Sequence, residues 1–241
     1  ARAAQTVSRI ANMNPTPQAA RAWFVTGTDT EIGKTFATCA LIHAARARGL
    51  TALAMKPVAA GTVDIGGEPI NEDVAALRSA GSHDPGTALI NPWCLAAPVA
   101  PHIAAAEAGV RIAPAPIEAA LAELRRRADV VFVEGVGGFR VPLAAAYDSA
   151  DLARDLGLPV VLVVGLRLGC INHALLTCEA IERRGLRLAG WIANRIDPDM
   201  LRPAQNVDSL RERIAAPLLG VLDWRADGDA RAAAAALTLP R

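Results

Sequence analysis

Short runs of apolar residues recur along the chain and are separated by longer stretches with helical spacing. The run Val160-Val161-Leu162-Val163-Val164 is typical, because every position is apolar. Continuous hydrophobicity of this kind predicts a strand that is buried on both faces, as in a parallel sheet. Strands of this type are predicted at residues 23–26, 53–58, 130–134, 160–165, 189–194 and 218–221.

The stretches between these runs predict helices, at residues 33–48, 71–79, 100–108, 116–127, 149–156, 171–184 and 206–215. Strands that alternate with helices predict a doubly wound α/β fold with a mostly parallel sheet. Ligands of such folds bind beyond the carboxyl ends of the strands. Polar residues that directly follow a predicted strand are therefore the first candidates for a functional site.

The segment from Gly27 to Thr35, with the sequence GTDTEIGKT, joins the first predicted strand to the first predicted helix. A glycine-rich turn that ends in Lys-Thr at this place predicts a phosphate-binding loop. The first N–H groups of a helix have no internal partner and carry partial positive charge, so a polyphosphate can bind there. Gly33 lets the backbone approach the phosphates, Lys34 can reach the β- and γ-phosphates, and the Thr35 hydroxyl can bind Mg²⁺.

This motif departs from the usual spacing. Five residues, rather than four, separate Gly27 from Gly33, and Thr28 occupies the place of the usual glycine. The alternative is an ordinary strand-to-helix turn that contains Gly-Lys-Thr. We favour the phosphate loop, because both flanking elements are predicted where the motif needs them.

Two charged residues lie toward the carboxyl ends of other predicted strands. Glu134 ends the strand at residues 130–134 and is followed by the glycine-rich segment GVGG. In phosphate-loop proteins an acid at the tip of a neighbouring strand completes the Mg²⁺ site. Lys56 ends the second predicted strand, where its ammonium could neutralise charge on a transferred phosphoryl group. The alternatives are a solvent-facing glutamate and a surface lysine.

Three further positions have an ordinary explanation beside a functional one. Asp73 stands in the first turn of a predicted helix, where acids are common for dipole reasons. The segment from Leu168 to His173 begins another helix, which could bind an anion or be an ordinary capped start. Asn194 ends a strand and could read a nucleobase edge or serve as a turn residue.

The composition excludes several classes of protein. The net charge is +1, with 25 Lys and Arg against 24 Asp and Glu, which argues against an obligate nucleic-acid binder. No apolar run approaches the roughly 20 residues that span a bilayer, so no membrane segment is expected. The cysteines form no C-x-x-C pair, which fits a reducing cytoplasm and predicts neither a zinc site nor a redox pair; they are Cys39, Cys94, Cys170 and Cys178.

Residues 1–21 differ from the rest of the chain, with three arginines, no acid and the turn-prone segment Asn14-Pro15-Thr16-Pro17. They contain no apolar core of a secretory signal and are expected to form a disordered N-terminal extension. Residues 22–241 are expected to form a single α/β domain, because 52% hydrophobic content supports a sizeable core.

Together these segments resemble the dethiobiotin synthetase family, in order, over residues 22–225. The longest matching segments are FVTGTDTEIGKT at residues 24–35, VEGVGG at 133–138 and LGCINHA at 168–174. The resemblance implies a P-loop nucleoside triphosphate hydrolase fold and an ATP-dependent cyclo-ligase of biotin biosynthesis. The implied reaction converts 7,8-diaminononanoate, CO₂ and ATP to dethiobiotin, ADP and phosphate, through a carbamate and a carbamic–phosphoric mixed anhydride.

The resemblance also implies a cytoplasmic homodimer, with the substrate site at the subunit interface, and Mg²⁺ as cofactor. The catalytic residues would be Lys56, Lys34 and Thr30. The Mg²⁺ ligands would be Thr35, Asp73 and Glu134. ATP would contact Glu31, Ile32, Gly33, Lys34, Thr35, Phe36, Asp73, Glu134, Gly135, Val136, Gly137, Asn194, Arg195, Asp223, Trp224 and Arg225. The substrate would contact Thr30, Lys56, Ala60 and, from the partner subunit, Gly169, Cys170 and Asn172.

Two positions depart from the family pattern. Ala60 stands where relatives can carry a serine that contacts the substrate, so one hydroxyl contact is missing or is supplied by Thr62. Asp223 stands where a proline can line the base pocket, which leaves the nucleotide preference open.

Three other classes of protein fit the sequence less well. Dimeric partitioning and cell-division ATPases share the fold but carry an extra lysine five residues before the loop lysine, where this chain has Asp29. Amidating synthetases of the cobyrinic type need a glutaminase domain, for which the chain has no room. A dinucleotide-dependent oxidoreductase would need Gly-x-Gly-x-x-Gly after the first strand, and the sequence there is different.

Overall fold

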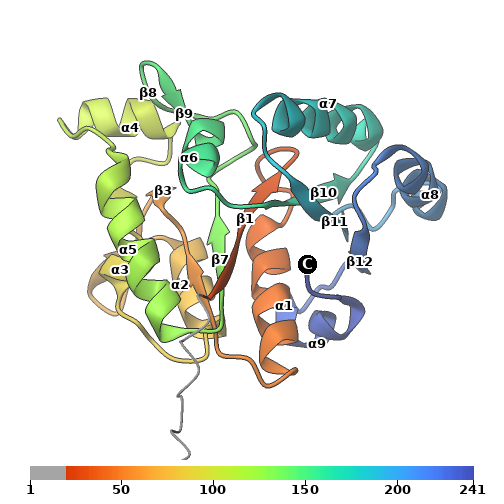
Figure 1. Cartoon of the computed structure of the whole chain (residues 1–241), viewed down its shortest axis with the longest axis horizontal. Coiled ribbons are helices and arrows are strands. Elements are labelled where there is room, and N and C mark those ends of the chain that lie inside the picture. Colours follow the sequence, from red (N-terminus) through yellow and green to blue (C-terminus); the bar gives the residue numbers. More distant parts are fainter. Residues whose placement is uncertain (1–19) are drawn as a thin grey trace, which may run out of the picture.

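The computed structural model describes residues 20–241. Its central sheet has six strands in the order β12-β11-β10-β1-β7-β2 (Figure 1). Every neighbouring pair is parallel, which confirms the predicted sheet. The strands are β1 (Arg21–Gly27), β2 (Ala52–Met55), β7 (Val130–Glu134), β10 (Val160–Leu166), β11 (Leu188–Arg195) and β12 (Leu218–Leu222).

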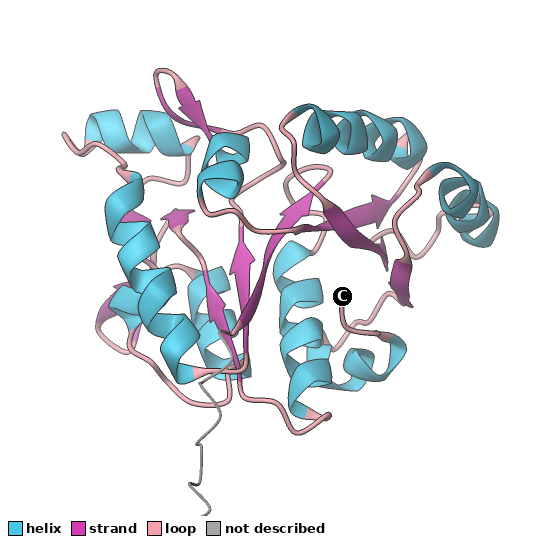
Figure 2. Cartoon of the chain, viewed as in Figure 1, coloured by secondary structure: helices cyan, strands magenta, loops and turns pink. Residues whose placement is uncertain are grey.

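Helices cover both faces of the sheet, so the fold is doubly wound with three layers (Figure 2). One face packs against α1 (Lys34–Arg46), α2 (Glu72–Ala80), α9 (Ala230–Ala233) and the 3₁₀ turn η1 (Ala234–Ala236). The other face packs against α5 (Pro114–Arg127), α6 (Ser149–Asp155), α7 (Cys170–Arg183) and α8 (Pro203–Arg213). Each strand therefore buries side chains on both sides, and all seven residues of β10 are buried, as its continuous apolar run predicted.

The predicted strand at residues 53–58 is wrong at its end. The strand β2 stops at Met55, and the chain resumes as the separate short strand β3 (Val58–Ala60). Pro57 lies between them and has no N–H to donate to a ladder, which explains the interruption. Lys56 consequently stands directly after the strand, at the carboxyl edge of the sheet.

Several short elements carry no periodic signal and were not predicted. They are β4 (Val63–Ile65), β5 (Glu68–Ile70), β6 (Trp93–Leu95), β8 (Pro142–Ala144), β9 (Tyr147–Asp148), α3 (Thr87–Ile90), α9 and η1. The helix α4 (Pro101–Glu107), in contrast, was predicted. The pairs β3–β6, β4–β5 and β8–β9 form small two-stranded sheets. The alanine-rich segment near the C-terminus is part of the core, because Ala233, Ala234 and Leu237 pack with α1.

The N-terminal boundary of the described part lies close to the expected one. Arg21 already belongs to β1 and pairs with Val130 of β7. Residues 1–19 lie outside the described residues, so the expected disordered extension stays a prediction. Within residues 20–241, no helix is both long enough and apolar enough to cross a bilayer.

Candidate active site

The phosphate loop begins at the end of β1 and leads directly into α1. Gly33, the residue before α1, has φ 74°, in the left-handed region that favours glycine. A Cβ at this position would lie 2.2 Å from Nδ2 of Asn194, at the tip of β11. The same amide nitrogen donates a hydrogen bond to the carbonyl of Ile32 at 2.9 Å. The contact between the loop and Asn194 therefore requires glycine here.

Lys34 is the first residue of α1 and is buried beside the loop. Its Nζ donates to the carbonyl oxygen of Asp29 at 3.1 Å. Burial, and secondly the nearby ammonium of Lys56, lower the pKa of Lys34 to about 8. The nearby carboxylates only partly offset the burial of the Lys34 ammonium. Phosphate oxygens beside it would therefore stabilise its charge.

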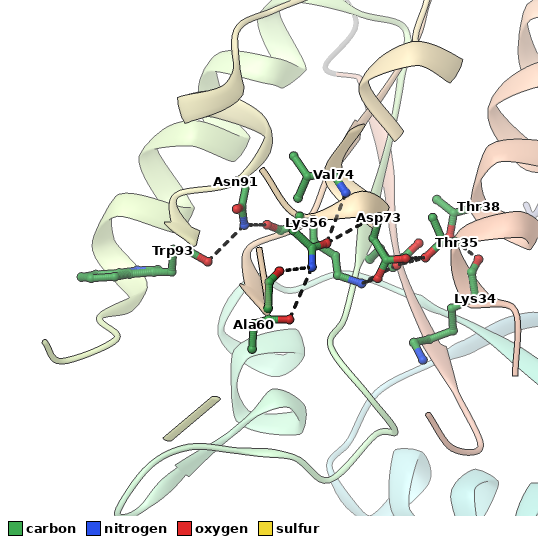
Figure 3. A network of polar contacts seen from close by, with 12 residues as sticks. Lys34, Thr35, Thr38, Lys56, Ala60, Asp73, Val74, Asn91 and Trp93 are labelled. Atoms are coloured by element: carbon green, nitrogen blue, oxygen red, sulfur yellow. Dashed lines mark hydrogen bonds and ion pairs between the residues drawn. The ribbon is translucent and has the colours of Figure 1, made fainter. Parts of the chain in front are cut away.

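Four side chains from separate segments meet beside the loop, namely Thr35, Lys56, Asp73 and Glu134. Figure 3 shows the contacts of Lys56 and Thr35 with Asp73. The Thr35 hydroxyl lies 2.7 Å from Oδ1 of Asp73 and 2.8 Å from Oε1 of Glu134. The Lys56 ammonium donates to Oδ2 of Asp73 at 2.8 Å and to Oε1 of Glu134 at 2.6 Å. Lys56 and Glu134 are buried, so their ion pair is shielded from water, whereas the side chain of Asp73 is 44% exposed.

The network fixes the charges of its members. Burial alone would lower the pKa of Lys56, but the carboxylates of Glu134 and Asp73 outweigh it and raise the pKa above the usual range. Burial would raise the pKa of Asp73, but Lys56 and the Thr35 hydroxyl outweigh it and lower the pKa. Lys56 is therefore a cation, and Asp73 is an anion, at neutral pH.

The oxygens of Thr35, Asp73 and Glu134 suit Mg²⁺. Mg²⁺ binds oxygens at about 2.0–2.1 Å in octahedral geometry, so neighbouring ligand oxygens lie roughly 2.9 Å apart. The Thr35 oxygen lies at nearly this spacing, 2.7 and 2.8 Å, from its two carboxylate partners. Among the described residues, Oε2 of Glu134 is buried without a hydrogen-bond partner, which leaves this oxygen available to a metal.

Within residues 20–241, no group of three or more His, Cys, Asp or Glu side chains is arranged to hold a metal ion. A site with two carboxylates and one hydroxyl is consistent with this, because Mg²⁺ commonly binds one or two carboxylates and completes its shell with phosphates and water. The residues present therefore fit a metal that arrives together with a nucleotide.

Two asparagines that were not predicted hold this network in place. Asn71 caps α2: its Oδ1 accepts from the N–H of Asp73 at 3.1 Å, and its Nδ2 donates to the carbonyl of Gly61 at 2.8 Å. Asn91 is buried and donates to the carbonyl of Lys56 at 2.6 Å. The capping position of Asn71 could have been found in the sequence, whereas the through-space contact of Asn91 left no local signal.

A cleft of about 450 Å³ lies over these residues and brings together the predicted phosphate-loop and catalytic residues. Ten of its lining residues were predicted from the sequence or the resemblance: Thr30, Glu31, Gly33, Lys34, Thr35, Lys56, Ala60, Asp73, Val136 and Gly137. Ala59 and Asn71 also line it and were not predicted. Glu134 lies beneath the cleft and is connected to it through Thr35 and Lys56.

Other predicted nucleotide contacts lie outside this cleft. Arg195 and Asp223, at the ends of β11 and β12, form an ion pair at 3.1 Å and line a separate cavity of about 260 Å³. Trp224 is half exposed, and Arg225 pairs with Asp227 at 2.7 Å. Ile32 and Gly135 are buried, and Phe36 packs against the core. Their roles toward a nucleotide stay predictions.

The predicted substrate residues at the start of α7 also lie apart from the cleft lining. Gly169 precedes the helix with φ 93°, and Asn172 is exposed. Cys170 is buried, and its thiol lies 3.9 Å from Oδ1 of Asn206. Leu168, directly before them, is 95% exposed. The predicted use of this helix start by a partner subunit stays a prediction.

The rarity of lysine is a further sequence signal for this site, and it was not used in the prediction. The chain has 25 Lys and Arg residues, and only Lys34 and Lys56 are lysine. Both lysines line the same cleft. Lysine differs from arginine in carrying a compact point charge on a flexible stem. The restriction of lysine to positions 34 and 56 therefore indicates that these two residues act at one site.

Relatives of the chain identify its family. A family model described as an AAA domain matches residues 21–232. The ATP-dependent dethiobiotin synthetase BioD of Aromatoleum aromaticum is 67% identical over 220 residues, which cover 91% of this chain and 98% of that protein. The chain belongs to the dethiobiotin synthetase family. The protein of the same name from Xanthomonas oryzae pv. oryzae is 54% identical with the same coverage.

Solved structures agree on the fold. The septum site-determining protein MinD from Pyrococcus horikoshii, complexed with Mg-ADP, aligns with a TM-score of 0.53 and 15% identity, covering 85% of this chain and 81% of that chain. A ParA family ATPase from Chlorobium tepidum aligns with a TM-score of 0.54 and 15% identity, covering 87% of each chain. At this identity the likeness concerns the fold alone, and it confirms the predicted P-loop fold of this dethiobiotin synthetase family member.

Proposed function

We propose that this member of the dethiobiotin synthetase family converts 7,8-diaminononanoate, CO₂ and ATP to dethiobiotin, ADP and phosphate, and that it needs Mg²⁺. The observation that carries the proposal is the meeting of Lys56, Asp73, Glu134 and Thr35 beside the phosphate loop. The 67% identity to a protein named ATP-dependent dethiobiotin synthetase supports the choice of substrates.

The proposed reaction has three steps. One substrate amine attacks the carbon of CO₂ and loses a proton, which gives a carbamate. A carbamate oxygen then attacks the γ-phosphorus, and ADP leaves, so that a carbamic–phosphoric mixed anhydride forms. The second amine attacks the carbonyl carbon and loses a proton, while the bond from that carbon to the phosphate oxygen breaks and the ureido ring closes. Phosphorylation is needed because an oxygen of the carbamate is otherwise a poor leaving group.

The chain contributes mainly positioned charge to this sequence. Lys34 would bind the β- and γ-phosphate oxygens. Lys56 would lie between the γ-phosphate and the carbamate and stabilise the charge that develops during transfer. Thr30 and Ala60 would lie near the diamine and the carbamate; both line the cleft together with the two lysines, which supports these assignments.

The remaining contacts concern the metal and the nucleotide. Thr35, Asp73 and Glu134 would hold Mg²⁺, which when bound would neutralise phosphate charge. Residues 31–36 and 135–137 would surround the phosphates. The residues proposed to contact the nucleoside are Asn194, Arg195, Asp223, Trp224 and Arg225. Asn194 uses its Nδ2 on Ile32, and its Oδ1 accepts no hydrogen bond from the described residues, which leaves an acceptor for a base.

We further propose a cytoplasmic homodimer in which the start of α7 serves the partner subunit. The first N–H groups of a 14-residue helix suit the carboxylate of the diamine, and Gly169, Cys170 and Asn172 stand at this end. The 95% exposure of Leu168 beside them supports a second copy that covers this surface.

ADP release, measured with and without the diamine plus bicarbonate, tests the proposed function. We expect release to depend on both additions and to match dethiobiotin formation, followed by mass spectrometry, in a ratio of one to one. Release that ignores the diamine would instead favour a switch ATPase of the kind that shares the fold. Dependence on the diamine without formation of dethiobiotin would reject the proposed product.

A further inference from the structure

The Lys56 ammonium bridges the two carboxylates that the proposed metal would also use. It lies 2.8 Å from Oδ2 of Asp73 and 2.6 Å from Oε1 of Glu134. Oε1 of Glu134 also accepts from the Thr35 hydroxyl at 2.8 Å. The single Thr35 proton is shared between this oxygen and Oδ1 of Asp73, which lies 2.7 Å away, so the firm donor to both carboxylates is Lys56. A metal that uses the oxygens held by Lys56 has to displace the ammonium.

The charges lead to the same conclusion. Asp73 and Glu134 carry two negative charges, and Lys56 supplies one positive charge among the described residues that contact them. A divalent cation among the same oxygens would place three positive charges within a few ångströms of one another. Lys56 and Glu134 have 4% and 0% of their side-chain surface exposed, so water does little to screen such repulsion. Repulsion over this short distance favours one cation over two between these carboxylates.

We propose that Lys56 is the resident counter-ion of the Asp73–Glu134 pair and exchanges with the metal. In the first state the ammonium offsets one of the two negative charges and bridges the carboxylates. In the second state the carboxylates hold the metal, and the released ammonium turns into the cleft that Lys56 already lines, toward the phosphates. This inference rests on the proposed function and adds an order to it, because Lys56 reaches the phosphoryl group only after the metal has arrived.

The use of lysine at this position fits such an exchange. A lysine stem has four flexible carbons and carries a compact charge, whereas an arginine fork would bind a carboxylate in a rigid, two-pronged manner. Arginine fills every basic position of the chain except Lys34 and Lys56. The backbone of Lys56 is held by Asn91 and by the carbonyl of Ile90 at 2.7 Å, so only the side chain has to move.

Mn²⁺ binding to the protein without nucleotide provides the first test, with free Mn²⁺ measured by electron paramagnetic resonance. Lys56→Met removes the competing cation and should bind Mn²⁺ about tenfold more tightly than the unsubstituted protein, since a charge at this distance shifts such equilibria by at least that factor. Equal or weaker binding by folded Lys56→Met would overturn the proposal. Lys56→Arg, which keeps a cation on the carboxylates, should not gain affinity.

Lys34→Met is the matched control, because it removes the same charge from the same cleft. Nζ of Lys34 donates to the Asp29 carbonyl, so its removal frees no carboxylate oxygen. Its gain in Mn²⁺ affinity should therefore be clearly smaller than that of Lys56→Met. Equal gains in Mn²⁺ affinity would mean that metal binding depends only on the total charge of the cleft. Lys56 would then not compete with the metal for the carboxylates, and the proposal would be wrong.

A second measurement needs no substitution at Lys56. Protein labelled with ¹⁵N-lysine has two side-chain ammonium resonances, which Lys34→Arg assigns. The labelled protein is saturated with a non-hydrolysable ATP analogue in EDTA, and Mg²⁺ is then added. The Lys56 resonance should shift on addition of the metal, as its partners change from carboxylates to phosphate. An unchanged Lys56 resonance at full metal occupancy would overturn the exchange.

Both measurements are made without the diamine, so they separate this inference from the proposed function. If dethiobiotin is not formed but Lys56 still exchanges with the metal, the substrate assignment is wrong and the exchange stands. If dethiobiotin forms but neither Mn²⁺ affinity nor the Lys56 resonance responds, the function stands and the exchange is wrong.

Discussion

The two ends of the proposed nucleotide site differ in how firmly the protein holds them. At the phosphate end, Lys34, Lys56 and Glu134 are buried, with 7%, 3% and 0% exposure. At the proposed nucleoside end, the side chain of Asp223 is 76% exposed, and Trp224 is 50% exposed. One end is a largely buried ionic network, and the other is a more open surface with two exposed ion pairs, Arg195–Asp223 and Arg225–Asp227.

This difference predicts which positions of the site tolerate amino-acid substitution. A buried charge that loses its partner costs several kcal/mol, whereas an exposed ion pair is worth about 0–1 kcal/mol. Substitutions at the phosphate end should therefore affect catalysis and folding strongly, while those at the nucleoside end should have small effects. The following predictions test this contrast, from the largest expected effect to the smallest.

Lys56→Met should lower kcat about 10³-fold, because an ammonium that stabilises developing charge acts in the transition state. The dissociation constant for ATP should change by less than about threefold, since such a group contributes little to ground-state binding. Steady-state kinetics and nucleotide titration measure the two effects. Circular dichroism checks that the variant, which leaves two buried carboxylates without their cation, is folded. Parallel losses of turnover and affinity would show that Lys56 only binds nucleotide.

Lys34 and Lys56 should differ at least about tenfold in their rate of acylation, because only a neutral amine reacts. The pKa of Lys34 is lowered to about 8, so its amine loses the proton as the pH rises through that value, and labelling should rise with it. The pKa of Lys56 is raised by its carboxylates, so it stays charged over the same range. Mass spectrometry of protein treated with acetic anhydride between pH 6 and 9 reads both sites, and similar profiles would contradict the assigned environments.

Asn71→Ala should reduce the free energy of unfolding by about 1 kcal/mol, the usual loss when an N-cap is removed. Asn71→Asp keeps the acceptor for the N–H of Asp73 but loses the donor to Gly61, so it should cost less. Urea unfolding of both variants gives the comparison. If the two variants were equally destabilised, the cap on α2 would not be the source of the effect.

Asp223→Ala should change the free energy of unfolding by less than about 0.5 kcal/mol, because its ion pair with Arg195 is exposed. Its effect on the ratio of ATP to GTP affinity tests whether Asp223 belongs to the proposed base pocket. If Asp223→Ala lowered kcat as much as Lys56→Met, the two ends of the site would not differ in their sensitivity to substitution.

The sequence predicted those parts of the molecule that depend on local pattern. Strands such as β7 and β10 are buried on both faces, so their apolar runs marked them within one residue of their ends. Thr35, Lys56 and Glu134 were found because parallel strands and the following turns bring their ends to one edge. Asp73 became a candidate only through the family resemblance, since an acid in a first helical turn has an ordinary explanation.

What the sequence did not predict depends on contacts between distant segments. The hydrogen bond from Asn91 to Lys56 spans 35 positions, and Asn194 reaches Ile32 across 162. Three-residue strands such as β3 and β6 exist because a neighbouring edge is available, and they are too short for a periodic pattern. The shared position of Lys56 on two carboxylates could be recognised only in three dimensions.

The restriction of lysine to the cleft has a practical consequence for anyone who handles this protein. An activated ester surface or an amine-reactive dye finds only the terminal amine and the two cleft lysines, which are 7% and 3% exposed. Attachment of the protein in a defined orientation therefore has to use another functional group.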